Sequence, residues 1–145
     1  MPASGGAAAA QRTGIVADAQ SSAAWVANAL TQSGYKADFT VKSFAELDRF
    51  FDEQAPRGSP KPRGLLGEQL GARIFAIGAY VGETLRRERG GEWIGDDKDP
   101  QAEINISVKL ADGTIFWPVQ RAMKRLKNGN EDSLAVYGAV LTGSR

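Results

Sequence analysis

Apolar side chains recur every three or four positions in several stretches of the chain, which predicts amphipathic helices. The first helix is expected over residues 15–34, where Gly34 occupies the position of a left-handed cap. Its apolar positions follow the helical spacing: Ala19, Ala23, Val26 and Leu30. A second helix is expected over residues 43–54, because Ser43 and Glu46 have the spacing of a capping box.

Two connecting segments flank the second helix. Residues 37–42 are interpreted as a short extended piece. Residues 55–64 hold three prolines and two glycines, a composition typical of a loop.

A long helix is expected over residues 65–89, and it combines an apolar stripe with many glycines. The stripe covers an arc of about 100° and consists of Leu66, Leu70, Ile74, Ile77, Val81 and Leu85. Four glycines fall beside this arc: Gly67, Gly71, Gly78 and Gly82. Each glycine costs roughly 0.8–1 kcal/mol relative to alanine inside a helix. A line without side chains permits close backbone approach, so it predicts tight packing of the helix on a sheet, or alternatively a groove for a ligand or partner.

An antiparallel sheet is expected after the long helix, because residues 103–110 alternate between polar and apolar side chains. Residues 112–113 are the Asp-Gly pair of a two-residue hairpin turn. Pairing outward from this turn places Leu110 opposite Ile115. A further strand entered at Trp93 would complete a three-stranded meander.

Two more helical segments are expected after the sheet. Pro118 ends the last strand and can start a helix over residues 119–129. The same pairing places Trp117 on the apolar face of the sheet. Residues 133–141 have an ambiguous pattern, which we interpret as a helix.

Length and composition then limit the organisation. The chain has 145 residues, 42% hydrophobic and 24% charged, as in a single globular domain. We expect a disordered tail over residues 1–14 and one α+β domain over residues 15–145, with a three-stranded antiparallel sheet packed on the glycine-striped helix between flanking helices. A formal charge of +1 gives no general attraction to nucleic acid or to a membrane surface, and neither is expected as a partner. The amino terminus makes a poor signal peptide, so a cytoplasmic location is expected.

The available chemistry is narrow, because cysteine and histidine are both absent. Disulfides, thiol catalysis, a histidine base and the usual zinc ligands are therefore excluded. Residues 96–99 (DDKD) lack the alternating spacing and central glycine of a calcium loop. We expect no metal and no cofactor.

The helix after Pro118 brings basic side chains next to a tryptophan. Four residues form a candidate contact surface for another protein: Trp117, Arg121, Lys124 and Arg125. This surface would suit a partner with an acidic surface. The alternative is a solvated basic face balanced by the acidic helix at residues 46–53.

A second candidate site follows the glycine stripe. Its groove would be lined by Gly78, Gly82, Glu83, Arg87 and Trp93. In an enzyme or ligand-binding domain, Glu83, Asp96 or Asp97 would supply the acidic group there, and Arg87 or Arg121 would hold an anion. The alternative for Glu83 is an exposed ion pair, because two arginines follow it at spacings of three and four.

Residues 65–141 also combine several motifs in a definite order. The run "GAYVGETLRRERGGEW" is followed by an acidic loop, an alternating strand, "IFWPVQRAMKRLKNG" and "EDSLAVYGAVL". This order resembles a group of small bacterial domains of unknown function, in which a glycine-bearing helix ends in Gly-Glu, Gly-x-x-Trp enters a strand, and Phe-x-Pro or Phe-Pro precedes a Lys-Arg helix. The matching positions are Gly78, Gly82, Glu83, Trp93, Pro118, Lys124 and Arg125. Trp117, between Phe116 and Pro118, departs from the simplest form of the pattern. Similar domains lie beside toxin and secretion genes, so the resemblance implies an immunity or adaptor role.

Two functions are therefore expected. The first is a non-catalytic protein-binding domain, in the form of an immunity or adaptor protein that caps a bacterial toxin or effector. The alternative is an enzyme or small-ligand-binding domain that uses a groove along the long helix. The pattern leaves a homo-oligomer open.

Overall fold

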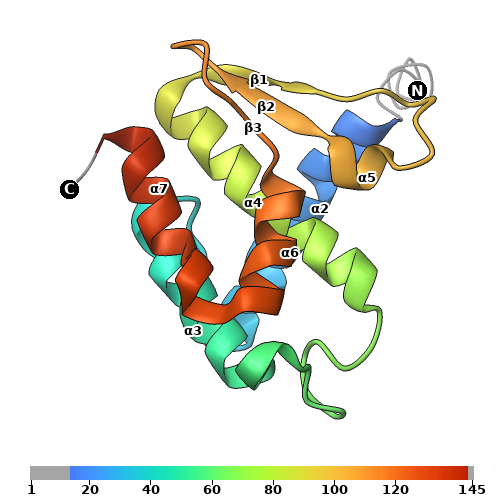
Figure 1. Cartoon of the computed structure of the whole chain (residues 1–145), viewed down its shortest axis with the longest axis vertical. Helices are drawn as coiled ribbons and strands as arrows, with labels where there is room; N and C mark the ends of the chain where they lie inside the picture. The colour runs from blue at the N-terminus through green and yellow to red at the C-terminus, as the bar shows by residue number, and fades with distance from the viewer. Residues whose placement is uncertain (1–13, 144–145) are drawn as a thin grey trace.

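The computed structural model describes residues 14–143, in which helices and a small sheet surround the long helix α4 (Figure 1). The helices are α2 (Ile15–Gln32), α3 (Phe44–Gln54), α4 (Leu70–Arg89), α5 (Ala102–Asn105), α6 (Pro118–Asn128) and α7 (Leu134–Thr142). The strands are β1 (Gly91–Ile94), β2 (Ser107–Leu110) and β3 (Ile115–Phe116), and short 3-10 turns cover Val41–Ser43, Pro56–Gly58 and Gly129–Asp132. The expected α+β class, with an antiparallel sheet on the long helix, is confirmed.

The helices at both ends of the described chain follow the sequence pattern. Helix α2 is followed by Gly34 at φ +94°, in the expected left-handed region. The ambiguous carboxy-terminal segment is helix α7, and the hydroxyl of Ser133 accepts a hydrogen bond from the backbone of Val136 at its start. Of the predicted tail, residues 1–13 lie outside the described part of the chain. None of the helices described here combines the length and the apolar character needed to cross a membrane.

The segment between α2 and α3 differs from the prediction. The extended piece predicted over residues 37–42 ends early, because Val41–Ser43 form a 3-10 turn after the extended Thr40. The capping box is also wrong, because the hydroxyl of Ser43 donates to the carbonyl of Thr40 and lies 2.6 Å from the hydroxyl of Tyr80. Glu46 accepts hydrogen bonds elsewhere, including one from the backbone of Lys36. Tertiary partners therefore displace the local cap.

Helix α4 is the centre of the fold, because its residues from Ile74 to Leu85 are all buried. It packs against α2 and α6 along its length, while β1 and β2 contact it near its carboxy-terminal end (Figure 1). It begins at Leu70 rather than Leu65, preceded by Gln69 in the left-handed conformation. The other helices and the sheet are therefore positioned by their contacts with this twenty-residue helix.

Only two of the four glycines in the predicted stripe lie within α4 at a close contact with another element. Gly67 precedes the helix, and a Cβ at Gly71 would meet open space. A Cβ at Gly78 would lie 2.6 Å from the Cα of Val119, and one at Gly82 would strike the ring of Trp93. Close approach is therefore confirmed at two positions, where the neighbours are helix α6 and one side chain of β1.

The sheet has the order β1-β2-β3 with antiparallel pairing throughout. The predicted strand over residues 103–110 is wrong in its first half, which forms helix α5. Asp99 favours this helix, because its carboxylate accepts hydrogen bonds from the backbone of Gln101 and from the side chain of Asn105. In β2, Val108 and Leu110 are buried and Lys109 is exposed as the alternation predicts, but Ser107 is buried as well.

The hairpin between β2 and β3 is one residue longer than predicted. Gly113 has φ +93° and donates its backbone N–H to the carbonyl of Leu110, while Leu110 donates to the carbonyl of Thr114. This is a three-residue loop closed by a left-handed glycine. Because one extra residue reverses the face of each later side chain, Phe116 is buried and Trp117 is 46% exposed. The predicted pairing of Leu110 with Ile115 is wrong.

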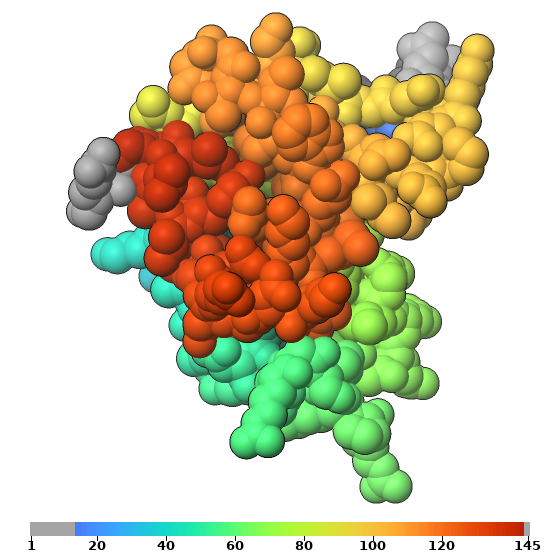
Figure 2. Space-filling model, in the orientation of Figure 1, coloured from blue at the N-terminus to red at the C-terminus, as the bar shows by residue number. Residues whose placement is uncertain are grey.

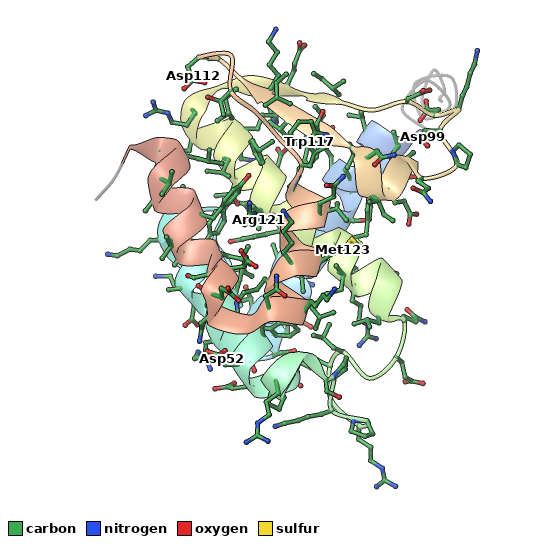
Figure 3. All side chains as sticks on the ribbon, viewed as in Figure 1. Asp52, Asp99, Asp112, Trp117, Arg121 and Met123 are labelled. Atoms are coloured by element: carbon green, nitrogen blue, oxygen red, sulfur yellow. The ribbon has the colours of Figure 1, made fainter. Side chains whose placement is uncertain are left out.

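Helices α6 and α7 lie on the same face of the molecule, and the loop after α3 protrudes at one end (Figure 2). Figure 3 shows that side chains of α6, including Arg121 and Met123, lie on this face. Several of the residues predicted to contact a partner thus lie on or directly before α6.

Candidate functional site

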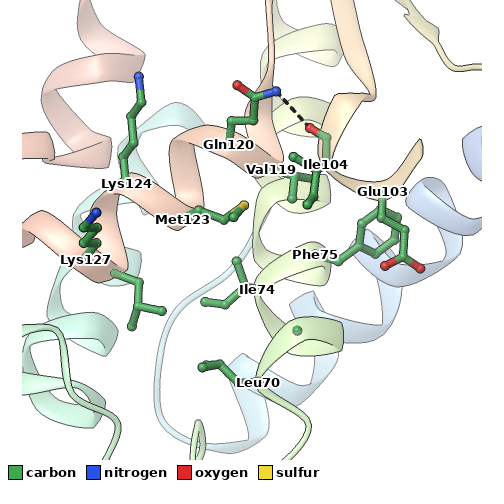
Figure 4. A pocket seen from close by; sticks show the side chains of 12 residues that line it. Leu70, Ile74, Phe75, Glu103, Ile104, Val119, Gln120, Met123, Lys124 and Lys127 are labelled. Atoms are coloured by element: carbon green, nitrogen blue, oxygen red, sulfur yellow. Dashed lines mark hydrogen bonds between the residues drawn. The ribbon is translucent and has the colours of Figure 1, made fainter. Parts of the chain in front are cut away.

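An open groove of about 730 Å³ runs between the amino-terminal half of α4, α5 and α6 (Figure 4). We call it the α4–α6 groove. It is lined by Leu70, Gly71, Ile74 and Phe75 of α4, by Glu103 and Ile104 of α5, and by Val119, Gln120, Met123, Lys124, Leu126 and Lys127 of α6. Most of these side chains are aliphatic or aromatic, and the volume falls in the range of ligand and peptide sites.

Gly71, the contact between α5 and α6, and Met123 define the shape of this groove. Gly71 places no side chain there, and nothing lies within 4 Å of the position of its missing Cβ. The short helix α5 presents Ile104 toward α6, and the side chain of Gln120 donates a hydrogen bond of 3.3 Å to the Ile104 carbonyl (Figure 4). Met123 remains 41% exposed, although it is one of the larger apolar side chains of the chain. The groove therefore exposes apolar surface to solvent.

Charged groups stand at the two ends of the groove. Lys124 and Lys127, in the carboxy-terminal half of α6, lie toward one end, and the carboxylate of Glu103 lies at the other (Figure 4). No acid–base pair is formed, because the ammonium groups and the carboxylate are separated by the apolar floor. The arrangement suits recognition of an apolar group with charges beside it, rather than proton transfer.

Two of the predicted contact residues are on the outer side of α6. Trp117 is exposed where α6 begins, so it does not join the core as the predicted register requires. Arg121 pairs with Asp132 at 3.2 Å, and its guanidinium lies 4.4 Å from the ring centre of Tyr137. Lys124 is exposed and also lines the groove. Trp117 and Lys124 are thus available to a partner, whereas Arg121 is partly engaged within the chain.

Arg125 does not belong to this surface, which corrects the expectation of a four-residue basic patch. It is 2% exposed, and its guanidinium lies 2.8 Å from both Asp48 and Asp52 of α3. Asp48 also accepts hydrogen bonds from the backbones of Leu134 and Ala135 at the start of α7. Arg125 and Asp48 therefore join α3, α6 and α7 inside the protein.

The predicted groove along Gly78 and Gly82 is filled by the chain itself. The backbone and side chain of Val119 lie against Gly78, and Pro118 and the ring of Trp93 lie against Gly82. Trp93 is only 9% exposed. The hypothesis of a ligand groove at these glycines is wrong, because their neighbours already occupy the space.

Glu83 is buried next to Trp93, so the alternative of an exposed ion pair is wrong as well. It is 4% exposed and accepts a 2.9 Å hydrogen bond from the indole Nε1 of Trp93. Arg86 and Arg87 also donate to it, at 2.7 and 2.9 Å. Burial raises the pKa of Glu83, but the hydrogen bonds from Arg86, Trp93 and Arg87 outweigh it and lower the pKa to about 2. Arg87 also lies 3.9 Å from the ring centre of Phe39, so this cluster is an internal structural contact.

The acidic loop after β1 supports the backbone. Asp97 accepts a 2.7 Å hydrogen bond from the backbone of Ile15, and Asp96 accepts one from the backbone of Lys98. Within residues 14–143, no group of three or more acidic side chains is arranged to hold a metal ion. Asp96 and Asp97, the other two candidates for the acidic group, are thus both engaged by backbone N–H groups.

The α4–α6 groove itself was not predicted. A helical pattern in α6 offered part of the signal, because Val119, Met123 and Leu126 share one side of that helix. The other wall depends on Ile104, which sequence alternation assigns to a strand. The groove could not be recognised without that short helix.

Comparison with known proteins gives no match: no family model, no curated protein sequence and no solved structure is significantly similar to this chain. The resemblance described above therefore stays a prediction.

Proposed function

We propose that this chain is a non-catalytic domain that binds another protein through the α4–α6 groove and the adjoining outer face of α6. The observation that carries the proposal is an open apolar groove with two lysines on its rim. In its sharper form, the partner is a toxin or effector that the domain caps, as an immunity or adaptor protein would.

Exposed apolar side chains support a protein partner. Met123 of α6 and Trp117, the residue directly before α6, are 41% and 46% exposed. Tryptophan and methionine are enriched where proteins meet, and apolar surface rimmed by polar groups marks such sites. A partner that covers this surface would remove the apolar area from water, at roughly 25 cal/mol per Å².

Charge supports an acidic partner. Lys124 and Lys127 border the groove, while the whole chain carries a net charge of only +1. The attraction is therefore local to the rim and not a property of the whole surface. Rim charges mainly speed association and select the partner, so a carboxylate beside the docked apolar group fits this position.

A small amphiphilic ligand is the second candidate, because the groove volume of about 730 Å³ is also that of a small-molecule site. In that case the apolar part would lie on Ile74 and Met123, and Lys124 or Lys127 would hold an anionic head group. Native mass spectrometry of the protein purified from its own cells distinguishes the two, since a retained small molecule adds a defined mass.

The test of the proposal is capture of partners from native cell extract by the wild-type chain and by two variants. Met123→Glu places a charge on the apolar wall, and Lys124→Glu with Lys127→Glu reverses the rim. Lys36→Glu is the control, because Lys36 is a solvent-exposed lysine outside the groove. We expect one protein to be captured by wild type and control and lost from both groove variants, with melting temperatures unchanged. Equal capture by all four chains would refute the proposal.

A further inference from the structure

The α4–α6 groove continues into an acidic region at its α5 end. A neighbouring hollow shares Gly71, Phe75 and Glu103 with the groove and extends to Asp18 of α2. A third hollow contains Asp18 and Glu103 together with Asp97 and Asp99. Glu103 therefore lines this end and Asp18 lies in the adjoining hollow, while Asp97 and Asp99 belong to the third hollow beyond them. An occupant that extends past Glu103 meets negative charge.

The opposite end of the groove is basic. Lys124 and Lys127 line it there (Figure 4). The turn at residues 56–58 packs beneath the end of α6, since a Cβ at Gly58 would lie 2.9 Å from the carbonyl oxygen of Lys127. Arg57, in the same turn, is exposed and does not line the groove. The groove thus has an apolar middle and opposite charges at its two ends.

We infer that the occupant is an amphipathic helix of the partner whose two ends carry opposite charges, with its acidic end at Lys124 and Lys127 and its basic end at Glu103 and Asp18. This inference rests on the proposed function and names the class of partner. It requires no covalent chemistry and no conformational change in the described chain.

The walls favour a helix over an extended segment. All residues that line the groove belong to helices. An added strand would find no strand edge there, and its backbone groups would lack partners, whereas a helix satisfies its own hydrogen bonds. Along α6, the groove runs from Val119 to Lys127, a rise of about 12 Å, or roughly two helical turns. A helix of three to four turns would therefore cover the apolar middle and place a charged turn at each end.

The chain direction of that helix follows from its own electrostatics. Helices are stabilised by acidic side chains in their first turn and basic side chains in their last turn. A partner helix of this usual kind would place its amino-terminal turn at Lys127 and its carboxy-terminal turn at Glu103.

The experiment selects peptides from a displayed library on the full chain. Each member has leucines at positions i, i+3, i+4 and i+7 and random residues in its first and last turns. Met123→Glu serves for counter-selection, so that only groove-dependent clones remain, and circular dichroism verifies that this variant is folded. A parallel selection uses Lys124→Glu with Lys127→Glu, in which the basic end of the groove is reversed.

We expect wild-type clones with acidic residues in one terminal turn and basic residues in the other. On the double variant, their affinity should fall about tenfold or more, and exchanging the acidic turn of the peptide for a basic one should restore it.

Groove-dependent clones without a charge preference, or with one sign of charge at both ends, would overturn the inference and leave the proposed function intact. Absence of any groove-dependent clone would overturn the helical occupant. Dimers of the wild-type chain that Met123→Glu dissociates would instead assign the groove to a second copy. The proposed function fails separately, if the partner captured from extract ignores Met123→Glu.

Discussion

Replacing Glu83 by glutamine tests the buried ion cluster that joins β1 to α4. Glutamine preserves the size of the side chain and one carbonyl oxygen, but it removes the charge that Arg86, Arg87 and Trp93 stabilise by hydrogen bonds. Because Glu83 is only 4% exposed, water cannot take over these contacts. The variant should therefore be less stable at neutral pH, and its stability should respond less to acid.

The pKa of Glu83 gives the magnitude. Its value is about 2 in the folded protein, against 4.5 for the ordinary group. A carboxylate with a lowered folded-state pKa contributes stability that is fully present above its unfolded pKa and is lost as pH falls through the folded value. At about 1.36 kcal/mol per pH unit, the contribution is about 3 kcal/mol at pH 7, of which about 2 kcal/mol is lost by pH 3.

The assay is urea unfolding followed by tryptophan fluorescence at pH 7 and pH 3, for wild type, Glu83→Gln and a control. Glu88→Gln is the matched control, because Glu88 lies on the same helix and is exposed. Wild type should exceed Glu83→Gln by about 3 kcal/mol at pH 7 and by about 1 kcal/mol at pH 3. Glu88→Gln should stay within about 0.5 kcal/mol of wild type at both pH values.

A constant difference between wild type and Glu83→Gln at the two pH values would refute this reasoning. It would mean that the loss of stability comes from altered packing around Trp93 and not from the charge. A wild-type advantage below 1 kcal/mol at pH 7 would show that water reaches Glu83 in solution.

Three further substitutions test the interior contacts. Arg125→Met should cost about 3–5 kcal/mol in urea unfolding, because it leaves Asp48 charged and buried without its cation; a cost below 1 kcal/mol would contradict the buried pair. Gly82→Ala should cost about 1–3 kcal/mol, because the new methyl group would overlap the ring of Trp93. Gly71→Ala should instead raise the melting temperature by about 2–4 °C, because the position is helical and faces open space. Equal effects of the two alanines in calorimetry would show that their surroundings do not differ.

The parts of the fold that depend on local pattern could be predicted from the sequence. Helices α2, α3 and α6 have clear apolar spacing, and the cap at Gly34 and the start of α6 at Pro118 follow from the conformations of glycine and proline. Gly78 and Gly82 indicated that another element packs closely on α4, because glycine destabilises a helix interior unless its missing side chain permits such a contact. The pattern did not reveal which element approaches.

The parts that depend on distant partners could not be predicted. Residues 102–105 alternate like a strand, but Asp99 and the contact with α6 stabilise a helix there. The hairpin register depended on whether Gly113 closes a loop of two or three residues, and both options suit an Asp-Gly pair. That single residue decided whether Trp117 faces the core or solvent.

The candidate site shows the same limit. Helical spacing groups Arg125 with Lys124, yet only Lys124 is exposed, because Arg125 meets Asp48, a residue 77 positions earlier in the chain. Nothing near Arg125 in the sequence indicates that partner. Conversely, the spacing between Glu83 and Arg87 indicated their pairing correctly but not its burial, which Trp93 brings about from β1.

The position of Asp48 has a consequence for how the chain is made. Its carboxylate accepts a hydrogen bond from the backbone N–H of Leu134, which is synthesised 86 residues later. At 5–20 residues per second, a ribosome needs about 4–17 seconds to supply that partner. Until then Asp48 lacks these backbone donors, and the side of α3 that packs on α7 in the folded protein lacks its cover.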